Sequence, residues 1–436
     1  MTRLALACLR GGIVAAGMLV TLAPSMHACA AASERRVVVA IEEKPDPDIG
    51  AGGTPRGYSG LQDYSGSDRA RRGAEAVARD HGLHEVSAWT VQALHLRCML
   101  YELPANADRD DALARLRQDK RVRIAQPLQE FRTYATPRQD APAAPPAGTA
   151  GPYNDPYVGL QHGFSTIGAA AAQRWSNGAR VEIAVVDTGI DDAHPDLAGQ
   201  VVAQRDFTAS AATIAAARDR HGTEVAGVIA AVANNGLGIV GVAPDATLRG
   251  FRACWPLEAG AADARCDTFT LAQAIGAAIG AKVRVINLSL GGPADPLLER
   301  LLAVAIERGI VVVGALPPDA RRDGFPVNVP GVIAVRSDDM PVDAATLAAP
   351  GTDILTLEPG GHYDYASGTS LATAHVTGAI ALLLALEPRL DAARAFSLLR
   401  DSSRGPSIDA CAAIRALAGR GHGCDATATG LAHADR

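Results

Sequence analysis

Three short segments carry residue types that together can activate a nucleophile. Asp187 follows an apolar run in VEIAVVDTGID, His221 opens the Ala/Val-rich HGTEVAGVIA, and Ser370 lies in SGTSLATAHVTG at the start of another apolar stretch. A serine hydroxyl is a weak nucleophile at its free pKa and needs an adjacent base. A histidine can take its proton and later return it to the leaving group, while a buried carboxylate fixes the imidazole tautomer. The three residues together predict acyl-transfer chemistry.

Each segment alone also has a purely structural explanation. An aspartate after a strand usually serves a turn, a His-Gly-Thr is often a turn-to-helix junction, and a Gly-Thr-Ser is a good helix cap. We expect His375, further along the last segment, to be a core histidine. The joint occurrence in the order Asp, His, Ser favours a catalytic triad. Backbone N–H groups at the start of the Ser370 helix, including that of Ser370 itself, would then face the anionic intermediate.

Further motifs extend this pattern over nearly the whole segment from Asn154 to about Leu417. They are NDPYVGLQHGF, DDAHPDL, NNGLGIVGVAP, INLSLGG, FPVNVPGVIAV and AAPGTDIL, in this order along the chain. With the three segments above, they resemble the subtilisin-like serine peptidase family. The resemblance implies a three-layer α/β fold, with a parallel sheet covered by helices on both faces. It also implies a serine endopeptidase that acts on polypeptides and needs no cofactor for its chemistry.

The resemblance assigns roles to other residues as well. It implies that Ser289, Leu290, Gly291 and Gly292 form an edge on which an extended substrate pairs through main-chain hydrogen bonds. It implies that the segment before residue 136 is an inhibitory propeptide, which assists folding and is removed by self-cleavage. Family members often bind structural calcium, and Asn234-Asn235-Gly236 lies where such a loop is expected.

One departure from the family pattern concerns the oxyanion site. The family has a Gly-Asn pair after the strand that corresponds to Ile310–Val313, and the asparagine amide donates to the oxyanion. Here the run is RGIVVVGALPPDA, which puts Pro317 and Pro318 at those positions. Proline has no donor in its side chain or backbone. The backbone N–H of Ser370 would remain, and a protonated Asp319 is the candidate substitute donor.

The elements that must position these residues are visible in the hydropathy pattern. After residue 152, short apolar runs alternate with helical stretches, which is typical of a parallel sheet with helices on both faces. The expected buried strands are Ile183–Val186, Thr247–Phe251, Val283–Ile286, Ile310–Val313 and Val332–Val335. One helix is well delimited, because Asp295 can cap it, Pro296 suits its first turn and Gly309 ends it.

The chain before residue 136 predicts a small α+β unit. Its expected elements are a strand at Val37–Ile41, a helix at Asp68–His81, an alternating strand around Leu94–Leu100, a helix at Asp108–Gln118 and a strand within Val122–Phe131. A ferredoxin-like β-α-β-β-α-β arrangement would accommodate them. We therefore expect a propeptide-like domain at 31–135, a Pro/Ala-rich linker at 136–152, a peptidase domain at 153–418 and a tail at 419–436.

The first 30 residues predict a signal peptide. Arg3 and Arg10 precede an apolar stretch, Gly11–Pro24, and Ala28-Cys29-Ala30 fits a small-x-small cleavage site. A permanent anchor and a lipid-modified Cys29 are the alternatives. A removed signal predicts a secreted protein, periplasmic or extracellular, without a transmembrane segment in the mature chain. The net charge of −6 and the absence of a Lys/Arg block indicate no nucleic-acid partner, and we expect a monomer.

Export changes the interpretation of the cysteines, because disulfides persist in oxidising compartments. The last four cysteines form two close couples, Cys254 with Cys266 and Cys411 with Cys424, and we expect a disulfide in each. Zinc binding is the competing interpretation, but neither couple has CxxC spacing. Cys98 is left over within the expected propeptide.

Two other functions stay open at this point. An aspartic protease built on Asp187-Thr188-Gly189 would need a second such loop, which the chain lacks. A secreted protein that keeps the fold but has weak or lost turnover, and acts by binding, is favoured by the proline at position 318. The complete triad opposes that alternative.

Overall fold

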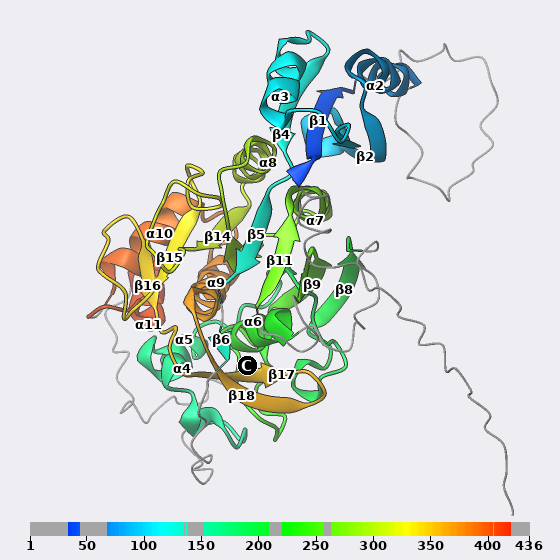
Figure 1. Ribbon diagram of the computed structural model, residues 1–436. Helices are drawn as coiled ribbons and strands as arrows, with labels where there is room; N and C mark the ends of the chain where they lie inside the picture. Colours follow the sequence, from blue (N-terminus) through cyan, green and yellow to red (C-terminus); the bar gives the residue numbers. More distant parts are fainter. Residues whose placement is uncertain are drawn as a thin grey trace, which may run out of the picture.

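The computed structural model describes residues 34–43, 68–134, 136–137, 152–208, 220–256, 263–403 and 405–419. The predicted signal peptide and tail lie outside these residues. The described chain forms a small N-terminal unit that rests on two helices of a large α/β unit (Figure 1).

The large unit is built on a seven-stranded sheet with the order β16-β15-β14-β12-β7-β9-β8, and every strand pair in it is parallel. Five of these strands coincide, within one or two residues, with the predicted apolar runs. Near-continuous apolar strands are expected where helices bury both faces of a parallel sheet. The strands are β7 Glu182–Asp187, β8 Val201–Asp206, β9 Thr247–Arg252, β12 Val285–Leu288, β14 Val311–Ala315, β15 Ile333–Ser337 and β16 Leu347–Ala349.

Two separate apolar clusters cover the faces of this sheet. Ile183 and Val185 of β7 belong to one cluster, and Ala184 and Val186 belong to the other, as the two-residue period of a strand requires. The first cluster contains helices α4 His162–Thr166, α5 Ala169–Gln173, α6 Arg220–Ala230, α9 Thr369–Leu386, α10 Ala392–Asp401 and α11 Ala410–Ala418. The second contains α7 Thr268–Ala281 and α8 Pro296–Glu307. The predicted three-layer α/β fold is confirmed.

Helix α9 is the central helix of the first layer. It is long and apolar enough to cross a membrane by length and composition, but 89% of it is buried inside the protein. This burial identifies α9 as a core helix. The α8 boundaries agree with the sequence, because the Asp295 carboxylate accepts the N–H groups of Leu297 and Leu298 at 3.0 Å.

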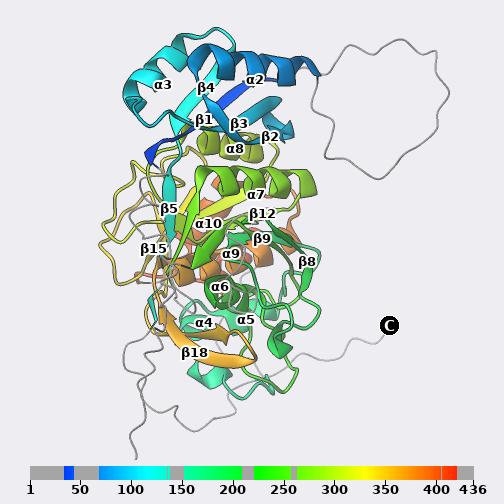
Figure 2. The same cartoon turned by 45° about the vertical axis from the view of Figure 1, so that its right-hand side comes forward.

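The small unit has the predicted β-α-β-β-α-β order, with a four-stranded antiparallel sheet arranged β2-β3-β1-β4. One face of its sheet packs on α2 and α3, and the other faces α7 and α8 (Figure 2). The alternation at Leu94–Leu100 belongs to β3 after a short helical turn, η2 Gln92–Leu94. The elements are β1 Arg36–Glu42, α2 Asp68–His81, β2 His84–Val91, β3 Leu96–Glu102, α3 Arg109–Gln118 and β4 Val122–Pro127.

The predicted strand within Val122–Phe131 is β4, and a further strand that begins before Phe131 leaves the small unit. Strand β4 ends at Pro127, whereas β5 (Glu130–Thr133) joins a separate sheet with the order β10-β11-β5-β13. Its partners are the strands β11 (Ala264–Asp267) and β13 (Leu290–Gly291) of the large unit. Figures 1 and 2 show β5 running from the small unit down the side of the large one. The chain therefore connects the units by a paired strand.

Candidate active site

Asp187 and His221 meet at the carboxyl end of the parallel sheet. Asp187 is the last residue of β7, and His221 is the second residue of α6. Nδ1 of His221 lies 2.7 Å from Oδ1 of Asp187, and both side chains are buried. In this arrangement the carboxylate fixes the imidazole tautomer, which leaves Nε2 as the proton acceptor.

The close approach of α6 to the loop after β7 requires a glycine. A Cβ atom on Gly222 would lie 2.0 Å from the carbonyl oxygen of Gly189. Instead, the Gly222 N–H donates to Oγ1 of Thr188 at 3.0 Å, and the Thr188 N–H donates to Oδ1 of Asp187 at 2.7 Å. The His-Gly-Thr segment therefore brings the base to the carboxylate and holds it there.

Burial and charge act in opposite directions on His221. Burial lowers the pKa of the imidazole, whereas the negative charge of Asp187 and its hydrogen bond raise it, with a smaller contribution from Glu224. The resulting pKa lies above the ordinary 6.5. Nε2 is buried and has no hydrogen-bond partner among the described residues. An acceptor with no partner in a buried position can take a proton from a nucleophile.

An ionic cluster behind His221 anchors α6 to a hairpin of β17 (Ile354–Glu358) and β18 (His362–Ser367). Arg220 lies 2.8 Å from Glu224 of its own helix and 2.5 Å from Glu358 of β17. Burial and the negative charge of Glu224 raise the pKa of Glu358 to about 8. The cluster thus holds the histidine helix against the hairpin that leads into Ser370.

Ser370 is the second residue of α9 and is buried. Its hydroxyl donates to the Ser289 carbonyl at 2.9 Å and accepts the Tyr134 N–H at 3.2 Å. Helices α6 and α9 pack against each other, which brings His221 and Ser370 to the same end of the sheet. The hydroxyl must rotate away from Ser289 before it can give its proton to Nε2. Catalytic hydrogen bonds often form only when the reacting complex assembles.

The predicted substrate edge is occupied by the chain itself. Thr133 pairs with Leu290 and Arg132 with Gly291, both antiparallel, while β11 pairs with β5 on its other side. A Cβ atom on Gly291 would lie 2.6 Å from the Tyr134 hydroxyl, and one on Gly292 would lie 2.6 Å from the Phe131 ring. Side chains at these two glycines would prevent so close an approach. Leu290 and Gly291 therefore pair with an extended strand of the chain itself, and the role of Ser289–Gly292 in substrate binding stays a prediction.

Side chains of this inserted strand alternate between protein and solvent. Phe131 is fully buried and packs edge-to-face on Phe325, with ring centroids 5.5 Å apart. Thr133 is also buried, whereas Glu130 and Arg132 are exposed. Burial and the nearby charge of Asp319 raise the pKa of Tyr134 to about 12. The Phe131 ring thus packs against Phe325, and the Tyr134 side chain packs beside Gly291, with Arg132 and Thr133 paired between them.

The strand continues beyond Ser370 on the other side. Thr136–Pro137 forms β6, which pairs antiparallel with β18, with Thr136 opposite Ser367 and Pro137 opposite Ala366. These two residues were predicted to begin a linker, but they are paired in the structure. Tyr134 contacts Ser370 and Thr136 pairs with Ser367 of β18, so paired segments of the chain lie on both sides of Ser370. Ala135 itself lies outside the described residues.

The loop after β14 holds the two prolines at the predicted place. The Pro317 carbonyl accepts the Ala320 N–H at 2.9 Å, and Pro318 is exposed. Asp319 is exposed, and its carboxylate accepts the Arg321 N–H at 3.2 Å. Its charge also acts on Tyr134. Asp319 therefore lies near the Tyr134 side chain in an acceptor role, and its assignment as a substitute oxyanion donor stays a prediction.

One predicted disulfide lies directly beside the inserted strand. Cys254 and Cys266 are bonded and join β10 (Cys254–Pro256) to β11, and Cys266 pairs with Phe131. Cys411 is also disulfide-bonded, while its predicted partner Cys424 lies outside the described residues. Cys98 is a free, buried cysteine of the small unit.

The carboxylates beside the loop proposed for calcium accept hydrogen bonds within the protein. Oδ1 of Asp196 accepts the Asn235 side-chain amide at 2.8 Å, and its Oδ2 accepts the Ile239 N–H at 3.0 Å. Asp155 likewise accepts the Asn234 N–H at 2.8 Å. Calcium also takes backbone carbonyl and amide oxygens as ligands, and structural calcium at this loop stays a prediction. The described part of the chain also contains no group of three or more His, Cys, Asp or Glu residues able to hold a metal.

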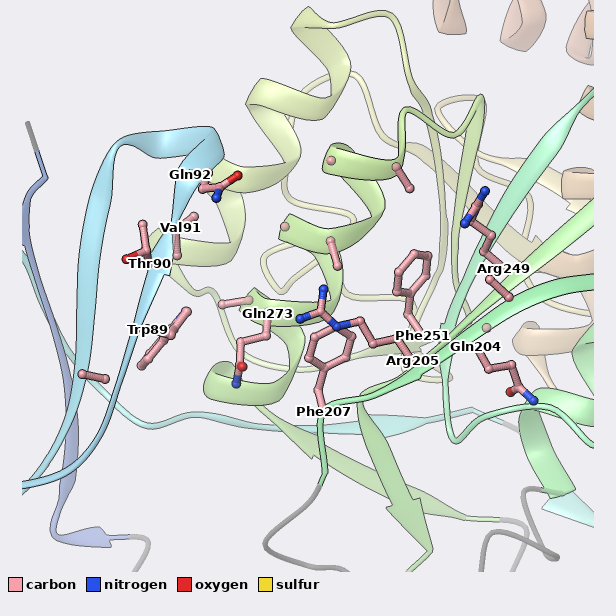
Figure 3. Close-up of a pocket in the computed structure, with 18 residues that line it drawn as sticks. Trp89, Thr90, Val91, Gln92, Gln204, Arg205, Phe207, Arg249, Phe251 and Gln273 are labelled. Atoms are coloured by element: carbon pink, nitrogen blue, oxygen red, sulfur yellow. The ribbon is translucent and has the colours of Figure 1, made fainter. Parts of the chain in front are cut away.

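A cavity of about 790 Å³ lies elsewhere, between the small unit and the edge of the large sheet (Figure 3). Trp89 of β2, Phe207 after β8, Phe251 of β9 and Gln273 of α7 contribute to its wall, and the Arg205 guanidinium stacks over Phe207. No triad residue lines it. Residues 130–134 lie instead along the predicted substrate edge.

The sequence did not indicate β11, β18 or the inserted strand as parts of the site. The alternation of buried Phe131 and Thr133 with exposed Glu130 and Arg132 is the signal that was present, but it was assigned to the small unit. Which sheet such a short strand joins is decided by tertiary contacts.

Comparisons with known proteins agree with this arrangement. Residues 178–421, more than half of the chain, match the subtilase family. The intracellular serine protease of Paenibacillus polymyxa is 37% identical over 243 residues, which cover 51% of this chain and 72% of that protein. Thermitase of Thermoactinomyces vulgaris is 36% identical over 242 residues, covering 53% of this chain and 84% of thermitase.

Two further comparisons cover less of the matched protein. Subtilisin E of Bacillus subtilis is 35% identical over 245 residues, or 52% of this chain and 62% of subtilisin E. Fervidolysin of Fervidobacterium pennivorans, a keratinolytic enzyme related to subtilisin, has a similar fold. Its TM-score is 0.66 at 23% identity, and the match covers 88% of this chain and 61% of that one. The family match includes Asp187, His221 and Ser370, and this chain belongs to the subtilase family of serine peptidases.

Proposed function

We propose that this protein is a serine endopeptidase that uses Asp187, His221 and Ser370 as its triad and first cuts its own chain between Tyr134 and Ala135. The observation that carries the proposal is the pairing of the chain on both sides of the nucleophile. Strand β5 pairs before Ser370 and β6 pairs after it, while the Tyr134 N–H donates to the Ser370 hydroxyl. A peptide held in this way is positioned as a substrate.

The reaction follows from the geometry. Nε2 of His221 takes the Ser370 proton as Oγ attacks the carbonyl carbon of Tyr134. The resulting anion is stabilised by the backbone N–H of Ser370 at the start of α9. His221 then gives its proton to the nitrogen of Ala135, the C–N bond breaks, and an acyl-enzyme on Ser370 remains. Water, deprotonated by His221, hydrolyses this ester and restores the serine.

After the cut, the small unit can remain bound as an inhibitor. Its chain caps two helices of the large unit. The Gln126 side-chain oxygen accepts the Leu297 N–H of α8 at 3.1 Å, and Gln129 exchanges hydrogen bonds with Thr268 at the start of α7. These contacts are independent of the Tyr134–Ala135 bond and would keep the product in the cleft. They support a propeptide role for the predicted domain at 31–135, with the cut after Tyr134.

Export of the precursor is part of the same proposal. An apolar stretch followed by a small-x-small site supports removal of about the first 30 residues, and the disulfide at Cys254 and Cys266 suits an oxidising compartment. N-terminal sequencing of the protein from culture medium and periplasm would test it. Material that still began at Met1 would contradict export by a cleaved signal.

The test of self-cleavage is incubation of the purified precursor, followed by mass spectrometry of the intact products. We expect one fragment that ends at Tyr134 and one that begins at Ala135. The rate should not depend on precursor concentration if the cut is intramolecular. A folded precursor of unchanged mass would instead favour a binding protein with lost turnover, as the prolines at the oxyanion position suggest. A fragment boundary elsewhere would contradict the assigned bond.

A further inference from the structure

The inserted strand and its neighbour β11 carry like charges opposite each other. Arg132 pairs with Arg265, and in an antiparallel pair the side chains of directly opposite residues lie on the same side. The other neighbour of Arg132 is Gly291, which has no side chain. A substrate residue in the position of Arg132 would therefore have Arg265 as its neighbouring side chain across the strand pair.

Arg265 has no partner of opposite charge among the described residues. The described part of the structure contains no ion pair or hydrogen bond of its guanidinium, and its Nε is buried without a partner. Arg132 is exposed on the opposite strand. Like charges directly opposite each other destabilise a strand pair, whereas opposite charges stabilise it. The chain's own segment is thus electrostatically unfavourable at this position.

The other residues of β11 that lie opposite β5 do not present an uncommitted charge to the bound strand. Glu130 lies opposite Asp267, a second like-charged pair, but the Asp267 carboxylate accepts the Thr270 N–H at 2.8 Å and caps α7. Phe131 lies opposite Cys266, whose sulfur is in the disulfide. Arg265 is the charged group on β11 that is not committed to another contact.

We propose that Arg265 makes this peptidase prefer substrates with an acidic residue at the third position before the cleaved bond. The proposal rests on the cleavage function proposed above, with Tyr134 as the residue that precedes the bond. Arg132 then weakens only the pairing of the chain's own segment with β11, while the contacts of the small unit with α7 and α8 remain. An intramolecular cut tolerates this repulsion, because a tethered segment has a high effective concentration. A separate polypeptide has no such advantage and needs the favourable charge.

The first experiment uses the processed enzyme and three peptides based on Leu128–Pro137, with Arg, Gln or Glu at the position of Arg132. We expect kcat/KM to rise from Arg to Gln to Glu, by about tenfold overall, because each change removes repulsion or adds attraction across one strand pair. An Arg265→Glu enzyme should reverse the order. An Arg265→Gln enzyme should flatten it, and 0.5 M salt should reduce the preference of the parent enzyme because exposed charges are screened. The same order in all three enzymes would overturn the proposal.

A second experiment does not need turnover. In the uncut Ser370→Ala precursor, Arg132→Glu should slow hydrogen exchange of the β5 amides several-fold, and adding Arg265→Glu should restore the parent rate. Arg115→Glu, at an exposed position on α3 far from the cleft, is the matched control and should leave β5 unchanged. If no peptide is cut but exchange follows the charges, the cleavage function fails while the charge preference stands. If peptides are cut without a charge preference and exchange is unchanged, the preference fails alone.

Discussion

The two halves of the candidate active site differ in completeness. The proton-transfer half has its carboxylate, its imidazole and its serine, with the Asp187–His221 contact at 2.7 Å. The oxyanion half has the start of α9, but the loop after β14 offers Pro317 and Pro318 where the family places a donor. Both halves lie at the ends of well-packed parallel strands. The difference therefore comes from two residues of one loop and not from the packing of the strands. It shows that activation of the serine and stabilisation of the oxyanion depend on separate parts of the fold.

The largest expected effect comes from removing the nucleophile. Ser370→Ala should lower turnover by about 10⁶, the figure known for this serine in subtilisin, and should leave the precursor uncut. Intact-mass measurement over several days would show one species. Ser165→Ala, a surface serine of α4, is the control and should mature normally. Maturation of a pure Ser370→Ala precursor would mean that another group attacks the bond.

A smaller loss is expected from Asp187→Asn. The amide can present an N–H to Nδ1 of His221, which favours the wrong imidazole tautomer without disturbing the packing around it. Turnover should fall by about 10⁴. Time courses of precursor cleavage measure this loss, and circular dichroism checks that the fold is kept. Unchanged cleavage would show that the 2.7 Å contact has a structural role only.

A substitution in the oxyanion half should raise turnover, in contrast to the losses above. Pro317→Gly together with Pro318→Asn supplies a side-chain amide at the position where the family has it. One such donor is worth about 10²–10³ in turnover, a figure measured in subtilisin. We expect kcat on a peptide substrate to rise by about that factor, with little change in KM. Pro317→Gly with Pro318→Ala is the control for loop flexibility. A folded double mutant no faster than its parent would indicate that another group, Asp319 first, already donates.

The smallest expected effects are on pH dependence, and they distinguish the roles of two buried histidines, His221 and His375. The Asp187 charge keeps the pKa of His221 above 6.5, and the base must be neutral to accept a proton. The value of kcat/KM should therefore fall as the pH falls through that raised pKa. Asp187→Asn should move the midpoint to lower pH in the residual activity. A midpoint that did not move would mean that another group controls the profile.

His375 should act on stability and not on chemistry. It lies on α9, its Nδ1 is 2.9 Å from the Leu371 carbonyl oxygen, and burial lowers its pKa to about 4. Because the folded pKa is below that of the unfolded chain, this histidine costs stability as the pH falls from about 6.5 towards 4. The loss is about 3 kcal/mol at pH 4. Thermal unfolding of the Ser370→Ala precursor at several pH values, compared with a His375→Gln variant, measures it. Equal acid sensitivity in both would exclude His375 as the cause.

The triad and the sheet could be predicted because their determinants are local. Asp187, His221 and Ser370 each follow or begin an element with a clear apolar pattern, and buried parallel strands such as β7 and β14 appear as continuous apolar runs. The caps of α3 and α8 are single residues, Asp108 and Asp295, at the predicted ends. The absence of a donor at position 318 follows from the chemistry of proline alone.

Tertiary structure alone decided what occupies the substrate edge. The sequence predicted a strand within Val122–Phe131 and a linker from Thr136. Strand β4 lies within that stretch, but packing adds a second strand, β5, between β11 and β13 and pairs β6 with β18. Strand pairing depends on cross-strand neighbours that lie more than 100 residues away in this chain, such as Arg265 opposite Arg132 and Ser367 opposite Thr136. The sequence thus determined which residue types can do the chemistry, and long-range pairing determined which segment of the chain lies beside them.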